Sequence, residues 1–216
     1  MSLITTHPNP SPQNSTFHTA AGVDVPTDGH DIEFMKQLHR HISTWVKFGD
    51  GSPGTHLTDE EMEYIKNNME SSLNTPNKTL TRVELGYHFE EQGLQEGDTI
   101  NFEESSLRSF SRTQKATLNY FKYQFTEGEG ITLYKTVGNV PHFNVTNFED
   151  YYSEEKESFV DMSSLTVRKV RTYKDMGEEQ LMNLVEELNL GDSYGYGDLD
   201  SLFLTPPEYI RVVEVE

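Results

Sequence analysis

The chain contains no cysteine, and this absence excludes several kinds of chemistry at once. Disulfide bridges, zinc sites built on thiolates and cysteine nucleophiles all need a thiol. Basic residues are also scarce, with 17 lysines and arginines against 36 aspartates and glutamates, which gives a formal net charge of -19. So acidic a protein is poorly suited to binding the phosphate backbone of duplex DNA or RNA. It is better suited to a basic protein partner, or to mimicry of nucleic acid.

Long hydrophobic runs and familiar nucleotide motifs are missing as well. No stretch approaches the 18 apolar residues of a membrane-spanning helix. Residues 1–8 have neither a basic nor an apolar segment, so we expect no signal peptide and a cytoplasmic protein. The lack of a GxGxxG or phosphate-loop motif argues against a Rossmann fold and a nucleoside triphosphatase. The eight histidines show no metal-ligand spacing, so we expect no metal and interpret His39 and His41 as surface positions.

Aromatic residues compensate for a low hydrophobic content. Only 34% of the 216 residues are hydrophobic, but 12 phenylalanines and 11 tyrosines supply enough apolar surface for a core. Residues 1–29 are rich in Pro, Ser, Thr, Asn and Gly, which is typical of a disordered or loosely attached arm. We expect a single domain over 30–216, with a helical part at 30–75 and a β core at 79–216.

The order of the expected elements favours an α+β fold. Apolar residues at helical spacing predict helices at 31–47, 58–73, 114–125 and 178–190, the second of which opens with a Thr58–Glu61 capping box. Strand-like patterns occur at 80–85, 99–102, 107–111, 131–137, 140–143, 165–170 and 209–215.

Three short motifs follow one another in the β-rich part. Arg82 lies in an apolar strand, Ser109 and Ser111 end another, and Glu155 and Glu157 stand one residue apart. Alternate side chains of an extended chain point the same way, so both glutamates would face one substrate. Of the similar acidic pairs at 61/63, 127/129 and 214/216, none is both preceded by an aromatic loop and followed by a strand.

The order Arg, Ser-x-Ser, Glu-x-Glu resembles that of the arginine-directed mono-ADP-ribosyltransferases. Within this family the chain is most similar to the small enzymes of tailed bacteriophages and to related bacterial toxins. The resemblance covers roughly residues 79–172. It implies an ADP-ribosyltransferase-like split β-sandwich core, NAD as co-substrate and an arginine on a protein as the acceptor.

The resemblance also implies a role for each motif. Glu157 would stabilise the positive charge that develops on the nicotinamide ribose, and Glu155 would orient or deprotonate the acceptor guanidinium. Arg82 would hold a phosphate or ribose of NAD. Ser109 would brace Glu157, and Ser111 would support the same group.

Aromatic residues beside the motifs complete the expected site. By resemblance, Tyr120 or Phe121 would pack near the nicotinamide, and Tyr151 and Tyr152 would read the protein target. If the chain is encoded by a phage, its targets would be host transcription or translation proteins in the host cytoplasm. NAD-capped RNA could then serve as an alternative donor.

Each motif has an ordinary structural interpretation too. A strand arginine such as Arg82 more often lies on the surface or in a salt bridge. Ser109 and Ser111 could cap the helix that follows, and Tyr151 and Tyr152 could simply pack in their loop. Two other functions also stay open, namely an NAD glycohydrolase with water as acceptor and a non-catalytic acidic protein that blocks a basic host surface.

The chain departs from the family's pattern at three places. Val83 and Glu84 follow the arginine where glycine is usual, and Glu84 would crowd a phosphate unless it points away. Phe110 replaces threonine between the two serines, and residues 161–164 replace a Pro/Gly turn. These departures affect the expected contacts with NAD more than the carboxylate pair.

Overall fold

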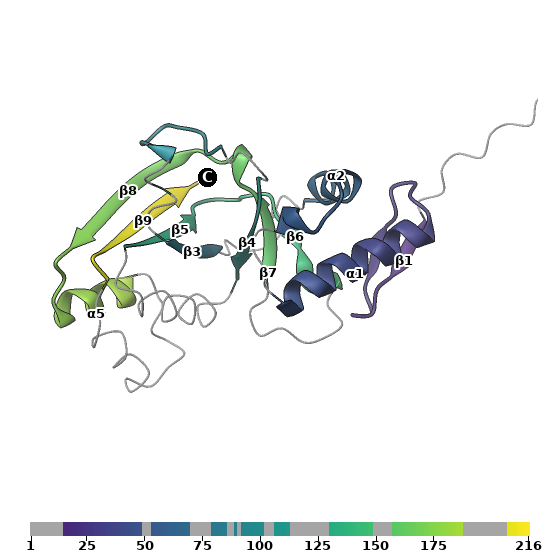
Figure 1. Cartoon of the computed structure of the whole chain (residues 1–216), viewed down its shortest axis with the longest axis horizontal. Coiled ribbons are helices and arrows are strands. Elements are labelled where there is room, and N and C mark those ends of the chain that lie inside the picture. The colour runs from purple at the N-terminus through teal and green to yellow at the C-terminus, as the bar shows by residue number, and fades with distance from the viewer. Residues whose placement is uncertain are drawn as a thin grey trace, which may run out of the picture.

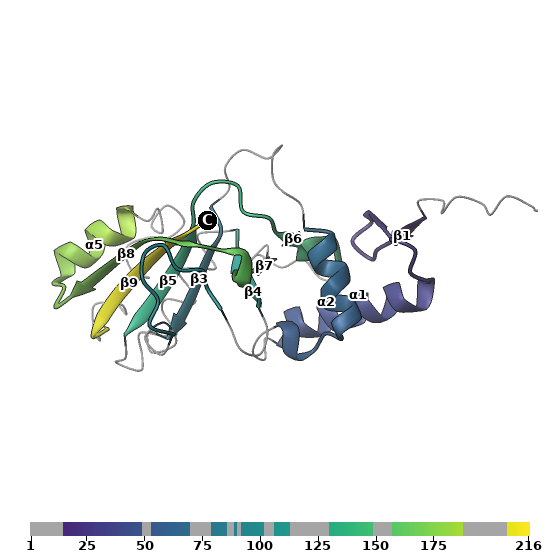
Figure 2. The same ribbon diagram turned by 90° about the horizontal axis from the view of Figure 1, so that it is seen from above.

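A computed structural model of the chain shows an N-terminal helical part packed against one half of a seven-stranded sheet (Figure 1, Figure 2). A further helix, α5, lies at the far end of the sheet (Figure 1). The structure describes residues 15–48, 53–69, 79–85, 89, 92–101, 106–112, 130–148, 157–187 and 207–216.

Helix α1 (Ile32–Phe48) confirms the helix expected at 31–47. Its buried side chains recur at helical spacing and are Met35, Leu38, Ile42 and Trp45. Trp45 meets Phe159 of strand β7 (Glu157–Asp161) edge to face, with ring centroids 5.1 Å apart. The apolar face of α1 is therefore what joins the helical part to the sheet.

Helix α2 (Asp59–Asn67) begins with the predicted capping box. The Glu61 backbone N–H donates to Thr58 Oγ1 at 3.2 Å, and the Thr58 backbone N–H donates to Glu61 Oε2 at 2.8 Å. The helix ends before the expected residue 73, because Asn68 leaves the helical conformation and its N–H caps the last turn.

A buried carboxylate joins α1 to α2. Glu61 is fully buried, and its Oε2 lies 2.8 Å from Nδ1 of His41. The expectation that His41 is a surface position was wrong, since its side chain is 31% exposed and turns toward Glu61. A carboxylate withdrawn from water needs such polar partners. His39 is half-buried as well, with its ring centroid 6.3 Å from that of Phe148.

Strands β1 (Thr16–His18) and β2 (Asp24–Pro26) form an antiparallel hairpin. Val25 of this hairpin is buried in the same hydrophobic cluster as the apolar residues of α1 and α2. Residues 15–29 thus differ from the expected loose arm, because they contribute a side chain to the core. Residues 1–14 lie outside the described part of the chain.

Seven strands form one mixed sheet in the order β6-β7-β4-β3-β5-β9-β8. Neighbours are antiparallel except β5 and β9, which run parallel. Besides β7, the strands are β3 (Thr81–Leu85), β4 (Leu107–Ser111), β5 (Ile131–Thr136), β6 (Phe143–Asn144), β8 (Val167–Lys174) and β9 (Tyr209–Val215). Short 3-10 turns are η1 (Pro53–Thr55), η2 (Val145–Phe148) and η3 (Met162–Ser164).

Two halves of this sheet meet at β3 and β4. These strands share one residue pair, Thr81 opposite Ser111, whereas β3 shares five pairs with β5 and β4 shares five with β7. In Figure 1, β4 and β7 run steeply across the direction of β8 and β9. The strands therefore diverge beyond Thr81, where the Arg82 side chain reaches the backbone of β4.

Helices cover one face of each half. Helix α5 (Glu178–Glu187) packs its apolar side on β5 and β9, while α1 and α2 pack on Leu107 of β4 and Phe159 of β7. A third cluster, which includes Phe110 and Tyr134, lies on the opposite face. The expected α+β class, with a helical part ahead of a β core, is confirmed. Among the described helices, none is long and apolar enough to cross a membrane.

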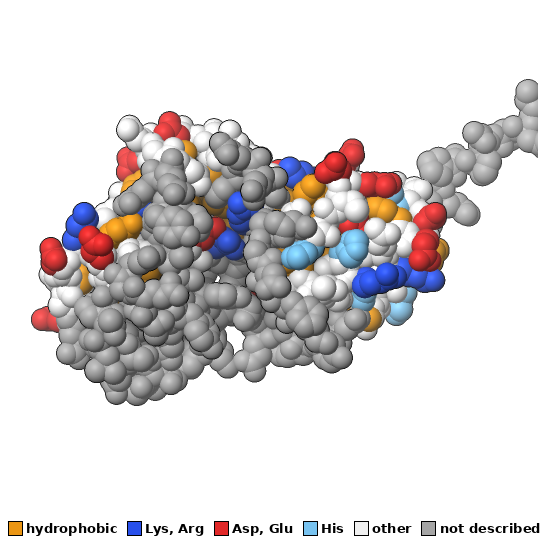
Figure 3. All heavy atoms as spheres, viewed as in Figure 1, with side chains coloured by type: hydrophobic (Ala, Val, Ile, Leu, Met, Phe, Trp, Pro, Cys, Tyr) orange, Lys and Arg blue, Asp and Glu red, His pale blue; other side chains and the backbone are white. Residues whose placement is uncertain are grey.

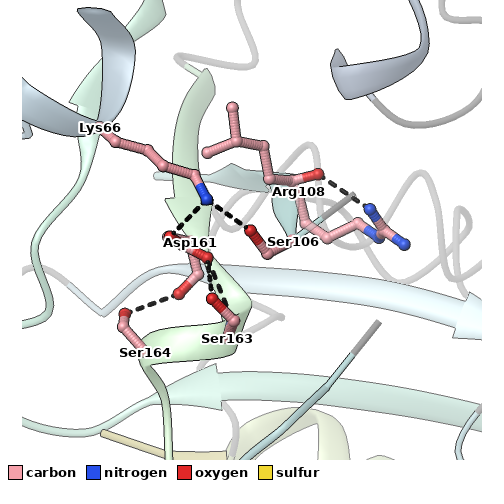
Figure 4. Close-up of polar contacts among 7 residues, drawn as sticks. Lys66, Ser106, Arg108, Asp161, Ser163 and Ser164 are labelled. Atoms are coloured by element: carbon pink, nitrogen blue, oxygen red, sulfur yellow. Dashed lines mark hydrogen bonds and ion pairs between the residues drawn. The ribbon is translucent and has the colours of Figure 1, made fainter. Parts of the chain in front are cut away.

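A polar cluster fixes α2 to the end of β7 (Figure 4). Lys66 Nζ of α2 lies 3.0 Å from Asp161 Oδ2 and donates to Ser106 Oγ at 2.9 Å. The Asp161 carboxylate also accepts the Ser163 backbone N–H at 3.1 Å and its hydroxyl at 2.6 Å. Burial alone would raise the pKa of Asp161, but hydrogen bonds from Ser106, Ser163 and Lys66 outweigh it and lower that pKa.

We predict that this cluster makes the protein acid-sensitive. Because the folded state lowers the pKa of Asp161, its carboxylate stabilises the fold above pH ~4, the ordinary aspartate pKa, and loses this effect as pH falls through the lower folded value. Asp161→Asn should lower the free energy of unfolding at pH 7 by about 1–3 kcal/mol, the usual contribution of hydrogen bonds to a charged group. Urea unfolding at pH 7 and pH 3 measures both effects, and a loss that is equal at the two pH values would argue against them.

Candidate functional site

The structure brings together three of the residues that the sequence motifs singled out. Ser109 Oγ of β4 donates to Glu157 Oε1 of β7 at 3.1 Å. Arg82 Nη1 of β3 donates to the backbone carbonyl of Ser109 at 3.0 Å. Ser109 therefore contacts both residues, Arg82 through its backbone carbonyl and Glu157 through its side chain, at the junction of the two half-sheets.

Strand register explains the contact between Ser109 and Glu157. In the β4–β7 ladder Ser111 stands opposite Glu157, and Ser109 stands opposite Phe159. Ser109 and Glu157 are thus diagonal neighbours on one face, within reach of each other's side chains. The same face carries Phe159 under the helical part, so α1 and α2 close one side of the site.

Both partners in this contact are buried. Glu157 is 6% exposed, Ser109 is 8% exposed and Ser111 is 7% exposed. A carboxylate in such a place requires hydrogen-bond donors, and the Ser109 hydroxyl is one of them. The Ser109 hydroxyl therefore holds Oε1 of Glu157 in place at the start of β7.

Arg82 forms a salt bridge, as is common for an arginine in a strand. Its Nε lies 2.6 Å from Glu84 Oε1, and its side chain is 22% exposed. An arginine has five N–H donors, and these two contacts engage Nε and one N–H of Nη1. Among the described residues no further hydrogen bond engages the other three.

Glu84 does not point away from the arginine. The sequence predicted that Glu84 would crowd a bound phosphate unless it pointed away from it. In the structure the Glu84 carboxylate pairs with the Arg82 side chain on the same face of β3. Glu84 is 8% exposed, and its Oε2 is buried with no hydrogen-bond partner among the described residues. The site therefore contains an Arg–Glu ion pair next to Ser109.

Sequence reasoning missed Tyr134. It stands opposite Arg82 in the β3–β5 ladder and is fully buried. Burial first, and then the charge of Glu84, raise the pKa of its hydroxyl far above the usual value. The signal was present, because the predicted strand at 131–137 places Tyr134 on the face opposite Ile131 and Leu133.

Five expected site residues lie outside the described part of the chain. They are Tyr120, Phe121, Tyr151, Tyr152 and Glu155. The helix expected at 114–125 also lies there. Within the described ranges, no group of three or more histidine or acidic side chains is arranged to hold a metal ion.

No protein-family model matches the chain, and no curated protein matches its sequence. Several solved structures are similar to it in fold. The Salmonella SpvB ATR domain has 11% identity and a TM-score of 0.41, with 82% of this chain and 96% of that domain covered. Plx2a, an ADP-ribosyltransferase toxin from Paenibacillus larvae, has 14% identity and a TM-score of 0.37, with 88% and 87% covered. An ADP-ribosyltransferase from Clostridium botulinum has 11% identity and a TM-score of 0.38, with 83% and 86% covered.

At these identities and TM-scores the similarities do not place the chain in a family.

Proposed function

We propose that the protein is an NAD-dependent mono-ADP-ribosyltransferase that modifies arginine on other proteins. The observation that carries this proposal is the contact of Ser109 with both Arg82 and Glu157, through two separate hydrogen bonds. The three residues come from separate strands, and the sequence motifs had singled them out in that order. Their meeting on three neighbouring strands supports the proposal.

Glu157 suits the charge that the reaction develops. Cleavage of the bond between nicotinamide and ribose gives the ribose the character of an oxocarbenium ion, as in glycoside hydrolysis. A carboxylate that is already desolvated and oriented stabilises such a cation without reorganisation. The hydrogen bond from Ser109 to Oε1 fixes the direction in which the Glu157 carboxylate faces.

Arg82 is our candidate for the contact with NAD. Its three N–H groups without a partner among the described residues can bind a pyrophosphate or ribose oxygen, and a planar guanidinium suits two such oxygens at once. Glu84 reduces the net positive charge here, so the affinity would depend more on orientation than on charge. Ser111, buried opposite Glu157, would support the same group.

The remaining roles are proposed from the resemblance alone. Glu155 would orient or deprotonate the acceptor guanidinium, and Tyr120 or Phe121 would pack near the nicotinamide. Tyr151 and Tyr152 would contact the target protein. We further propose a phage enzyme that acts in the host cytoplasm on basic transcription or translation proteins, with NAD-capped RNA as a second donor.

Incubation with labelled NAD and bacterial lysate tests this proposal. We expect covalent transfer of label to at least one protein, located on arginine by fragmentation of the labelled peptide, and none with heat-inactivated enzyme. Free ADP-ribose and nicotinamide without labelled protein would instead identify an NAD glycohydrolase.

The net charge of -19 favours one rival, a non-catalytic acidic protein that covers a basic surface. A protein of that kind would be expected to present one acidic face. In Figure 3 the acidic side chains of the described residues are spread over both ends of the molecule. Failure to bind NAD in a thermal-shift assay, together with a partner that salt releases, would establish this rival.

A further inference from the structure

The ion pair between Arg82 and Glu84 is short, but it leaves one oxygen of the Glu84 carboxylate buried without a hydrogen bond to any described residue. Nε and Oε1 are 2.6 Å apart, but Glu84 is 8% exposed and its Oε2 lacks a hydrogen-bond partner among the described residues. A carboxylate oxygen buried in this way is destabilising, and buried ion pairs are often no more stable than apolar replacements. Stability alone therefore does not explain why a glutamate stands here.

The guanidinium of Arg82 is held at two points from two strands. Glu84 holds Nε from the same face of β3, and the carbonyl of Ser109 on β4 holds Nη1. The second contact exists because β3 and β4 share only the Thr81–Ser111 pair, so β3 does not continue the ladder past that point. Two fixed acceptors determine the plane of a guanidinium, and its remaining N–H groups then have a fixed direction.

Glu84 is itself held in place by the sheet. It stands opposite Thr132 in the β3–β5 ladder, one step from the Arg82–Tyr134 pair. Thr132 and Tyr134 are fully buried, so the wall behind the carboxylate is closely packed. Glu84 can therefore act as a rigid support for the arginine.

We propose that Glu84 is a positioning residue that orients the Arg82 guanidinium toward the pyrophosphate of NAD. This inference rests on the proposed function. The role depends on the hydrogen-bond acceptor at Oε1 and not on the negative charge, which by itself opposes the binding of an anion. Glutamine keeps such an acceptor without the charge, while threonine suits a strand but is too short to reach Nε.

Calorimetric titration of NAD into variants made in a Glu157→Gln background tests this role without turnover. We expect Glu84→Thr to weaken NAD binding about tenfold, since losing preorganisation of one bidentate contact costs roughly that factor. We expect Glu84→Gln to bind within about threefold of its parent, or more tightly, because the acceptor stays and the opposing charge is gone. The NMR signal of the Arg82 Nε–H should keep its hydrogen-bonded shift in the glutamine variant and lose it in the threonine variant.

A matched control comes from the ion pair of Glu214 with Arg171, 2.9 Å apart and partly buried on the same sheet. Glu214→Thr should change thermal stability but leave NAD affinity unchanged. Unaltered affinity in Glu84→Thr, or a loss of about tenfold in Glu84→Gln, would overturn the positioning role. If neither the wild-type protein nor the Glu157→Gln parent binds NAD, the proposed function fails instead, so the two failures are distinguishable.

Discussion

Glu157→Gln should reduce the release of nicotinamide from NAD by about a thousandfold, because loss of one preorganised charged group at a developing charge has effects of that order. Glutamine has the same shape and can still accept the Ser109 hydroxyl, so the packing at the start of β7 should persist. The substitution therefore removes the negative charge that we propose acts on the ribose, and little else. The measurement is the steady-state rate of nicotinamide release at saturating NAD, together with the melting temperature of each variant.

Glu214→Gln is the matched control for this experiment. Glu214 belongs to another acidic pair of the same Glu-x-Glu spacing, and its side chain is 24% exposed on β9. We expect this variant to keep the wild-type rate. A Glu157→Gln enzyme that retains more than about a tenth of the wild-type rate, with an unchanged fold, would mean that Glu157 does not stabilise the reaction's charge.

Glu155→Gln should separate two activities that Glu157→Gln removes together. If Glu155 acts on the acceptor guanidinium, its loss should lower transfer to arginine about a hundredfold, the lower range for a general base. A charged guanidinium is a poor nucleophile, so transfer needs this carboxylate, whereas attack by water on the same ribose does not. Hydrolysis of NAD to free ADP-ribose should therefore continue.

The ratio of transfer to hydrolysis is the quantity to measure, with a small guanidine compound as a defined acceptor. In Glu155→Gln the ratio should fall, while in Glu157→Gln both rates should fall in parallel. An equal loss of both rates in Glu155→Gln would show that the two carboxylates do not divide the work in this way.

Sequence patterns predicted the helices and strands well where the stabilising contacts are between residues close in sequence. The Thr58–Glu61 capping box is formed by neighbours in sequence, and both of its hydrogen bonds are present. The last strand, expected at 209–215, has those bounds because β-branched and aromatic residues are concentrated there. The hairpin at 16–26 was missed, since its stability depends on burying Val25 against helices that follow it in the chain.

The side-chain contacts between strands were harder to predict from the sequence than the positions of the strands themselves. Strand alternation puts Arg82 and Glu84 on one face, but no local pattern predicts that they pair with each other and leave Glu84 Oε2 without a partner among the described residues. The contact of Arg82 with the Ser109 carbonyl depends on the divergence of β3 from β4, which no local pattern encodes. The roles of these residues stay predictions until the variants are measured.

Intact-mass spectrometry of a labelled target protein is the most direct measurement of the proposed activity. After treatment with the wild-type enzyme and NAD, we predict that the target gains the mass of one ADP-ribosyl group, and that fragmentation locates it on arginine. The Glu157→Gln enzyme should leave the mass unchanged. An unmodified target after wild-type treatment, or equal modification by Glu157→Gln, would show that this chain is not the transferase we propose.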